Sequence, residues 1–234
     1  MVLFGTIVNT LTIIIGCFIG LFFTKIQEKY KETIMQGIGL VVILIGLQMA
    51  FETNSIIIVL LSILSGAAIG EFLKLEDLLN QLGEWVSSKF RTKSNNTNVA
   101  QAFVTASLIF VVGAMAILGA LDSGLRGDHE ILVTKAMLDG FTAFVLTTTL
   151  GFGVVLSAIP VFLYQGAIAI FATQIEKWIP DVLFNDMITE ITAVGGLLIV
   201  AIGLNILKLT QIRVSNLLPA LVMVGVILAI NYQF

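Results

Sequence analysis

Long apolar blocks alternate with short polar segments along the whole chain. A helix of about 17–25 apolar residues crosses the hydrocarbon core of a bilayer, and eight blocks reach or approach that length. The pattern predicts an all-α fold, a polytopic membrane bundle of about eight transmembrane helices. The expected spans are residues 2–23, 35–51, 55–70, 102–121, 131–150, 154–171, 191–207 and 215–230.

Composition supports the membrane class. Of 234 residues, 58% are hydrophobic and 12% are charged, against about 25% charged in an average soluble domain. We therefore expect residues 1–234 to form a single transmembrane domain whose surroundings are the lipid bilayer. The sequence has no basic arm, so nucleic acid is not an expected partner. The single cysteine, Cys17, excludes an intramolecular disulfide and a cysteine-based metal cluster.

Residues 72–98 have a different pattern from the apolar blocks. From 72 to 90, leucines recur at helical spacing while charges occupy the other positions, which predicts an amphipathic helix. Trp85 is suited to anchor this helix in the membrane interface, although packing on the protein's own loops is the alternative. Residues 91–98, RTKSNNTN, are expected to be a polar linker.

The distribution of Lys and Arg predicts the orientation. Nine of the 12 basic residues follow the first, third and seventh expected spans. Because basic loops stay in the cytoplasm, both termini are predicted to lie outside and residues 72–98 inside. The triplet Gly151-Phe-Gly153 separates the fifth and sixth spans, or alternatively forms a re-entrant turn.

The expected span at 131–150 contains two opposite charges, Lys135 and Asp139, which lie four residues apart and hence on one helix face. Thr142 and Thr149 follow on that face. A charge near the bilayer centre costs about 2.5–3.5 kcal/mol on insertion scales, so such residues pair, face a bundle interior or line a wet path. A structural ion pair, a polar site in a transport pathway and snorkelling of Lys135 all remain open.

An internal repeat is indicated by two similar segments. GLVVILIGLQM begins at Gly39 and GLLIVAIGLNI begins at Gly196, so that Gln48 corresponds to Asn205. If spans one to three correspond to spans six to eight, the two repeats have opposite orientations, as in many secondary transporters. Similar packing faces without common ancestry are the alternative. Buried amides bridge helices or contact substrate, and Asn9, Gln48, Gln165 and Asn205 join the predicted pathway.

Motifs of other function classes are missing from the sequence. It contains no GxxxxGK[ST] phosphate loop, no HExxH and no GxSxG. The single histidine, His129, falls in a predicted loop and is expected to be solvated. The acids Asp122, Asp128 and Glu130 lie in the same region, where loop acids usually face water. We therefore expect no enzyme activity, no catalytic residues, no metal and no cofactor.

Several segments together resemble a known family. They are GTIVNTLTIIIGCFIGLFF, TIMQGIGLVVILIGLQMA, GDHEILVTKAMLDGF and GFGVVLSAIPVFLYQGAIAIFA. The resemblance is to the bacterial membrane family catalogued as domain of unknown function 554, and it covers nearly the whole chain. Its most specific parts are Gly127-Asp128, Lys135, Leu138-Asp139-Gly140 and Tyr164-Gln165-Gly166. The resemblance implies a multi-pass protein of the bacterial plasma membrane and implies no substrate.

Two functions remain as hypotheses. The first is a small secondary transporter or channel-like permease for a small solute or ion, in which Asp139 takes up a proton or cation when Lys135 is displaced. The second is a membrane scaffold or sensor that binds a partner through residues 72–98. Glycine-rich helix faces also allow a homodimer.

Overall fold

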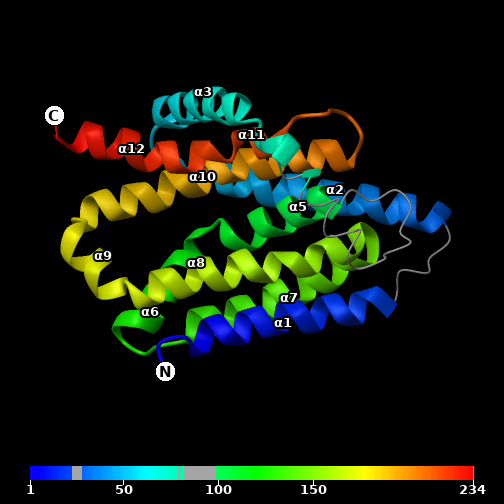
Figure 1. Cartoon of the computed structure of the whole chain (residues 1–234), viewed down its shortest axis with the longest axis horizontal. Helices are drawn as coiled ribbons and strands as arrows, with labels where there is room; N and C mark the ends of the chain where they lie inside the picture. Colours follow the sequence, from blue (N-terminus) through cyan, green and yellow to red (C-terminus); the bar gives the residue numbers. More distant parts are fainter. Residues whose placement is uncertain (23–27, 79, 82–98, 234) are drawn as a thin grey trace. The chain divides into compact units, whose positions relative to one another are not determined.

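The computed structural model describes residues 1–22, 28–78, 80–81 and 99–233, and every regular element in those ranges is a helix (Figure 1). The fold is therefore all-α, as predicted. The helices are α1 (Phe4–Phe22), α2 (Glu28–Ala50), α3 (Ile56–Leu73), α5 (Val99–Val111), α6 (Ala114–Leu125), α7 (Glu130–Leu150), the 3-10 helix η1 (Gly151–Ser157), α8 (Ala158–Ile170), α9 (Ala172–Trp178), α10 (Asp181–Ile206), α11 (Val214–Leu217) and α12 (Pro219–Gln233).

Five helical stretches among the described residues are long and apolar enough to cross a membrane, and a sixth is the bent pair α5–α6. This number falls short of the predicted eight, which is not confirmed. Two segments account for the difference. The apolar part of α2, Met35–Ala50, is short, and the single stretch Glu130–Ile170 contains two of the predicted spans.

The chain forms two compact units, each made of segments distant in sequence. Unit 1 comprises Met1–Lys31 and Leu82–Trp178, and unit 2 comprises Glu32–Gln81 and Ile179–Phe234. Each unit is described by itself below. The division separates α1 from α2 and α3, although the three are consecutive.

In unit 1, α1 and α7 pack side by side and parallel. Gly5 lies against Leu132, and further along the pair Gly16 lies against the carbonyl of Gly140. Gly20 then meets Phe144 and Thr147. A side chain at these glycines would overlap α7, so the GxxxG at Gly16–Gly20 allows close approach, as such motifs do.

The third helix of this group, α8, runs in the opposite direction along α1. Gly166 lies beside Leu3, and Gln165 reaches Asn9. Since Leu132 and Gln165 both lie beside the first half of α1, the chain must reverse between them, and η1 occupies the reversal. Gly151 opens η1 with φ +77°, a conformation that favours glycine.

Unit 2 contains two antiparallel helix pairs. In the first, Gly39 and Gly46 of α2 face Gly203 and Gly196 of α10, respectively. In the second, Gly66 of α3 lies against Ala220 of α12, and Gly70 against Asn216 in α11. Small residues at each crossing bring the two backbones close together.

Several predicted boundaries are wrong. The span expected at 102–121 is broken into α5 and α6, because Gly113 adopts φ +132° between them. The helix α10 begins ten residues before the expected span at 191, after Pro180, which suits a helix start. The helix α2 likewise begins at Glu28, within the expected charged loop. Most of the predicted amphipathic helix and linker, 79 and 82–98, lies outside the described residues.

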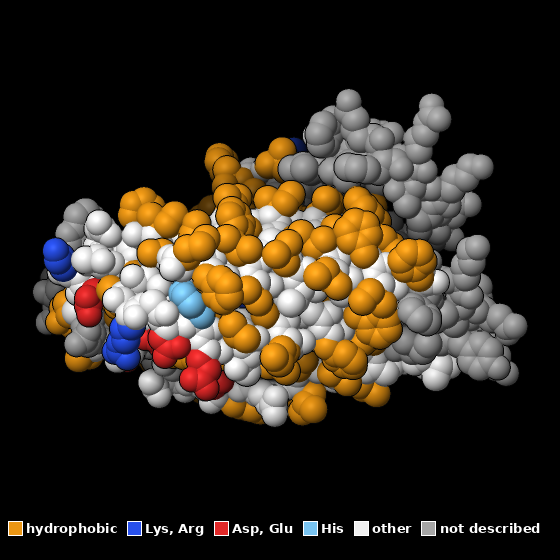
Figure 2. All heavy atoms as spheres, turned by 90° about the horizontal axis from the view of Figure 1, so that it is seen from below, with side chains coloured by type: hydrophobic (Ala, Val, Ile, Leu, Met, Phe, Trp, Pro, Cys, Tyr) orange, Lys and Arg blue, Asp and Glu red, His pale blue; other side chains and the backbone are white. Residues whose placement is uncertain are grey.

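Among the residues drawn in colour in Figure 2, most of the visible surface is apolar, and most of the charged side chains lie toward the left of the view. Exposed apolar residues of α1 and α7 contribute to the apolar surface of unit 1; among them are Leu11, Ile15, Phe18, Met137 and Phe141. Large exposed apolar areas are expected where a protein faces lipid, and they agree with membrane insertion.

Candidate functional site

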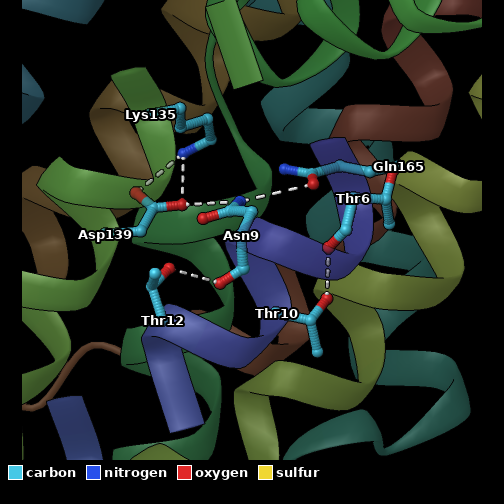
Figure 3. A network of polar contacts seen from close by, with 7 residues as sticks. All are labelled: Thr6, Asn9, Thr10, Thr12, Lys135, Asp139 and Gln165. Atoms are coloured by element: carbon cyan, nitrogen blue, oxygen red, sulfur yellow. Dashed lines mark hydrogen bonds and ion pairs between the residues drawn. The ribbon is translucent and has the colours of Figure 1, made fainter. Parts of the chain in front are cut away.

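Three helices of unit 1 bring four polar side chains together in a buried cluster (Figure 3). The Lys135 Nζ lies 2.8 Å from each carboxylate oxygen of Asp139. The Asn9 Nδ2 donates to Asp139 Oδ2 at 3.0 Å and to Gln165 Oε1 at 3.3 Å. We call this group the polar cluster: Asn9 from α1, Lys135 and Asp139 from α7, and Gln165 from α8.

The helices determine this arrangement. One turn of α7 separates Lys135 from Asp139, so both side chains project from one face. That face packs on α1 because glycines at positions 5, 16 and 140 remove the side chains that would hold the helices apart. Asn9 lies between the close contacts at Gly5 and Gly16 and therefore points at Asp139.

The cluster is almost completely sealed by protein. Asn9 and Gln165 are 0% exposed, Lys135 7% and Asp139 6%. Removing a charge from water is expensive unless a partner and hydrogen bonds compensate it. Asp139 receives both kinds of compensation, from the Lys135 ammonium and the Asn9 amide.

Some polar atoms of the cluster have no partner within the described part of the chain. They are the Asn9 Oδ1 and the Gln165 Nε2, and the nearby Thr6 Oγ1 on α1 shares this property. Turning either amide over does not help. A turned Asn9 would place its oxygen against the Asp139 carboxylate, and a turned Gln165 would place its NH₂ against that of Asn9. Buried polar atoms without partners are rare and point to a bound water, ion or ligand.

A second polar contact lies at the end of unit 1 where α1 begins. The Ser123 Oγ lies 2.6 Å from His129 Nδ1 and 3.0 Å from the carbonyl oxygen of Val2. Because a hydroxyl has one proton, both bonds form together when His129 donates from Nδ1 and Ser123 donates to Val2. The His129 ring also lies against the Phe4 ring. The expectation of a simply solvated histidine is wrong.

The polar contacts of unit 2 lie at helix ends. The Glu190 carboxylate, 2% exposed, accepts from the Thr53 hydroxyl at 2.6 Å and from the backbone N–H groups of Asn54 and Ser55 at 2.9 and 3.0 Å. It thereby caps the start of α3 from another helix. At the other end of α3, Glu71 accepts from Arg213 and Asn216, both at 2.6 Å.

The structure places the eight predicted pathway residues in different surroundings. It brings Lys135, Asp139, Asn9 and Gln165 together. Thr142 is half-buried on α7, and Thr149 donates to the carbonyl of Leu146 in its own helix. The remaining two lie in unit 2, where Gln48 is exposed and Asn205 is bound to residues 210 and 212 of the following loop.

The sequence pattern did not point to Thr6, Thr147, Ser123 or Glu190. Thr6 and Thr147 are both buried, and the Thr6 hydroxyl has no partner among the described residues. Thr6 precedes Asn9 by one turn, and this spacing is the only signal that could have identified it. Ser123 and Glu190 depend on contacts between distant segments, which no local pattern shows.

No group of three or more His, Cys, Asp or Glu side chains that could hold a metal ion is found among the described residues. Two of the three acids near the start of α7 have partners of another kind. Asp122 lies 3.6 Å from Arg126, and Asp128 accepts from the backbone N–H of Glu130 at 3.0 Å.

Comparisons with known proteins place the chain among membrane proteins. It matches the model of a family described as "Protein of unknown function (DUF554)" over residues 4–229. An "Uncharacterized membrane protein YdfK" of Bacillus subtilis is 36% identical, over 99% of this chain and 98% of the relative. An "Uncharacterized protein YqgA" of Escherichia coli is 30% identical, over 94% and 93% of the two chains. No solved structure matches the chain.

Proposed function

The chain belongs to the DUF554 family of proteins of unknown function, and from that premise we propose that it is a small secondary transporter or channel-like permease. The polar cluster is the site at which a small solute or ion binds during passage. The protein acts in the bacterial plasma membrane with both termini outside. We also propose that it is not an enzyme, because its sequence contains no HExxH and no GxSxG motif.

One observation carries this proposal. An ion pair and two amides are buried at one place within helices that are apolar enough to span a membrane, and two of the amide atoms have no partner among the described protein atoms. A purely structural ion pair gains nothing from such atoms, because each unmet buried group costs about 1–3 kcal/mol. A binding site gains from them, because the solute supplies the missing bonds.

The helix directions support eight crossings. The expected first and fifth spans, α1 and α7, are parallel, while α1 and α8 are antiparallel. The pairs α2–α10 and α3–α12 are antiparallel as well. If eight spans cross the membrane in alternating directions, the first and fifth spans are parallel. The first and sixth, the second and seventh, and the third and eighth are then antiparallel, as observed here.

The glycine contacts of unit 2 support the inverted repeat. If position 39 corresponds to 196 and 46 to 203, a two-fold axis converts the contact of Gly39 with Gly203 into a contact of Gly196 with Gly46. Both contacts are present. Inverted repeats are a common plan of secondary transporters, in which discontinuous helices line the site.

Passage requires the cluster to open. The polar cluster is occluded, so α1 must move away from α7 or α8 before a solute enters or leaves. Either movement breaks a hydrogen bond of Asn9, to Asp139 or to Gln165, and exposes the ion pair to water. Binding of a solute to Asp139 then competes with the Lys135 ammonium.

Flux through reconstituted protein tests the proposal. Liposomes that contain the purified protein should take up at least one member of a panel of labelled small ions, amino acids and neutral solutes. The substitution Asp139→Asn should abolish that uptake. Asp128→Asn, in the loop before α7, is the control and should retain it. Normal uptake by folded Asp139→Asn protein contradicts the role of Asp139.

The scaffold or sensor hypothesis concerns residues 72–98, most of which lie outside the described residues. It stays a prediction. Deletion of residues 75–95 with a linker in their place should leave flux intact if the permease proposal holds. If the deletion abolishes capture of a partner and the wild-type protein shows no flux, the scaffold or sensor hypothesis is favoured.

A further inference from the structure

The composition of the polar cluster also selects a class of solute, an inference that rests on the proposed permease function. The cluster contains one cation, Lys135, one anion, Asp139, and two neutral amides, so its net charge is zero. A solute with a net charge would add an uncompensated charge to a site less than a tenth exposed, which is unfavourable. The solute that fits carries no net charge.

The unmet groups fall into two kinds. On the donor side are the Gln165 Nε2 and the third N–H of Lys135, since the two carboxylate oxygens of Asp139 account for two of its three protons. On the acceptor side is the Asn9 Oδ1, and the Asp139 carboxylate beside it gains a free acceptor position when Lys135 moves away. A solute that only accepts hydrogen bonds would leave the acceptors of the cluster without a partner, and one that only donates would leave the donors without one.

We propose that the polar cluster binds a small zwitterion, with its carboxylate at Lys135 and Gln165 and its ammonium at Asp139 and Asn9. An α-amino acid is the solute of this chemistry. When the Lys135–Asp139 pair opens, each residue loses one opposite charge, and the zwitterion returns one to each. The exchange gives each residue a full opposite charge in place of the one it loses, which a neutral amide cannot do.

The position of the cluster limits the size of this solute. Along the α1–α7 pair it lies between the contact of Gly5 with Leu132 and the contact of Gly16 with Gly140. Both contacts leave no room for an added Cβ atom. A zwitterion with a small side chain, such as glycine or L-alanine, is therefore the appropriate probe.

Four probes of one size class separate the alternatives: glycine, acetate, methylammonium and acetamide. The first carries both charges, the next two one charge each, and the last none. We expect glycine to raise the melting temperature of the detergent-purified full chain, and the other three to leave it unchanged. The same glycine should be taken up by proteoliposomes that contain the protein. L-Alanine should behave like glycine.

Variants link the effect to the cluster. Gln165→Ala and Asn9→Ala should each raise, by at least tenfold, the glycine concentration that is needed for half of the rise in melting temperature. Gln101→Ala removes an exposed amide from α5 in the same unit and should leave it unchanged. Where Gln165→Ala fails to fold, Gln165→Glu serves instead. It adds a negative charge beside the bound carboxylate and should also abolish the glycine effect.

The outcomes distinguish this inference from the permease proposal. Asp139-dependent uptake of acetate or methylammonium without a glycine effect overturns the zwitterion and leaves the permease standing. A glycine effect that depends on Asn9 and Gln165, without uptake of any probe, supports the zwitterion site and overturns transport. An equal effect of acetamide and glycine, or no effect of any probe, overturns the inference.

Discussion

The two units use buried polar residues in opposite ways. In unit 2, Glu190 belongs to α10, but its buried carboxylate lies beside the start of another helix, α3, where backbone N–H groups and a threonine hydroxyl satisfy it. In unit 1, the carboxylate of Asp139 lies within a helix, where no free N–H groups are available, and side chains from other helices must satisfy it. Helix ends offer stabilising partners without further cost, whereas a polar group within a span requires its own partners.

The difference extends to the atoms that lack a partner. In unit 2 these are two hydroxyls, Ser62 and Thr192, within the described residues. In unit 1 they include amide atoms of Asn9 and Gln165 that adjoin an ion pair. A hydroxyl can turn toward its own helix backbone, but a planar amide fixed by one bond cannot. The comparison is consistent with structural roles in unit 2 and with the binding role that we propose for unit 1.

The largest effect on stability is expected from Lys135→Met. It leaves the Asp139 charge buried without its partner, and removal of one member of a buried pair typically costs about 3–5 kcal/mol. Thermal unfolding in detergent measures the loss. The double variant Lys135→Met/Asp139→Leu should recover most of the stability and transport nothing. If Lys135→Met alone is as stable as the wild-type protein, the ion pair of Lys135 and Asp139 is solvated.

A large effect is also expected from Gly16→Ala. The added Cβ would overlap the carbonyl of Gly140 on α7, and overpacking of this kind costs about 1–3 kcal/mol or more. Gly37→Ala in α2 is the matched control, because nothing lies within 4 Å of a Cβ there. The control should unfold at or above the wild-type temperature. Equal behaviour of the two variants would argue against the close α1–α7 contact.

For Glu190→Ala we expect an intermediate loss of stability, about 1–3 kcal/mol, because the backbone N–H of Asn54 loses its acceptor and that of Ser55 retains only the Thr53 Oγ1. Uptake per folded molecule should stay normal, since the residue belongs to unit 2 and has a structural role. Unfolding and proteoliposome uptake are measured on the same preparation. Lost uptake with normal stability would remove the distinction between the two units.

The smallest effect on stability is expected from Ser123→Ala, about 1 kcal/mol, for the hydrogen bonds to Val2 and His129. The loss should be local, because these bonds hold the first residues of α1. Hydrogen exchange should therefore increase at residues 4–8 and remain unchanged in α12. A uniform increase along the chain would indicate a global rather than a local role.

Part of the site could be predicted from the sequence. Opposite charges four residues apart in an apolar block identify Lys135 and Asp139, because only sheltered charges persist there. The sequence also predicted Asn9 and Gln165 as polar residues within spans. It could not separate them from Gln48 and Asn205, because the assignment of helices to units depends on contacts between segments more than 100 residues apart.

The fold, like the site, could be predicted from the sequence only in part. Apolar length predicts helices, and glycine spacing predicts the close contacts at Gly16 and Gly20. The break at Gly113 was missed, since a glycine within a membrane helix is usually a packing residue and only its φ of +132° identifies it as a break. The early start of α10 was missed because acidic residues interrupt the apolar pattern before residue 191, and the contacts of one of them, Glu190, with the 53–55 turn are not visible in the sequence.

The central claim, that a solute reaches the polar cluster, is tested most directly by cysteine accessibility. With Cys17→Ala as background, Asn9→Cys and Ile13→Cys place thiols one turn apart on α1, at positions that are both 0% exposed. If α1 opens to admit solute, a small membrane-impermeant thiol reagent should label residue 9 at least tenfold faster than residue 13. Equally slow labelling at the two positions would mean that the cluster is a sealed structural contact.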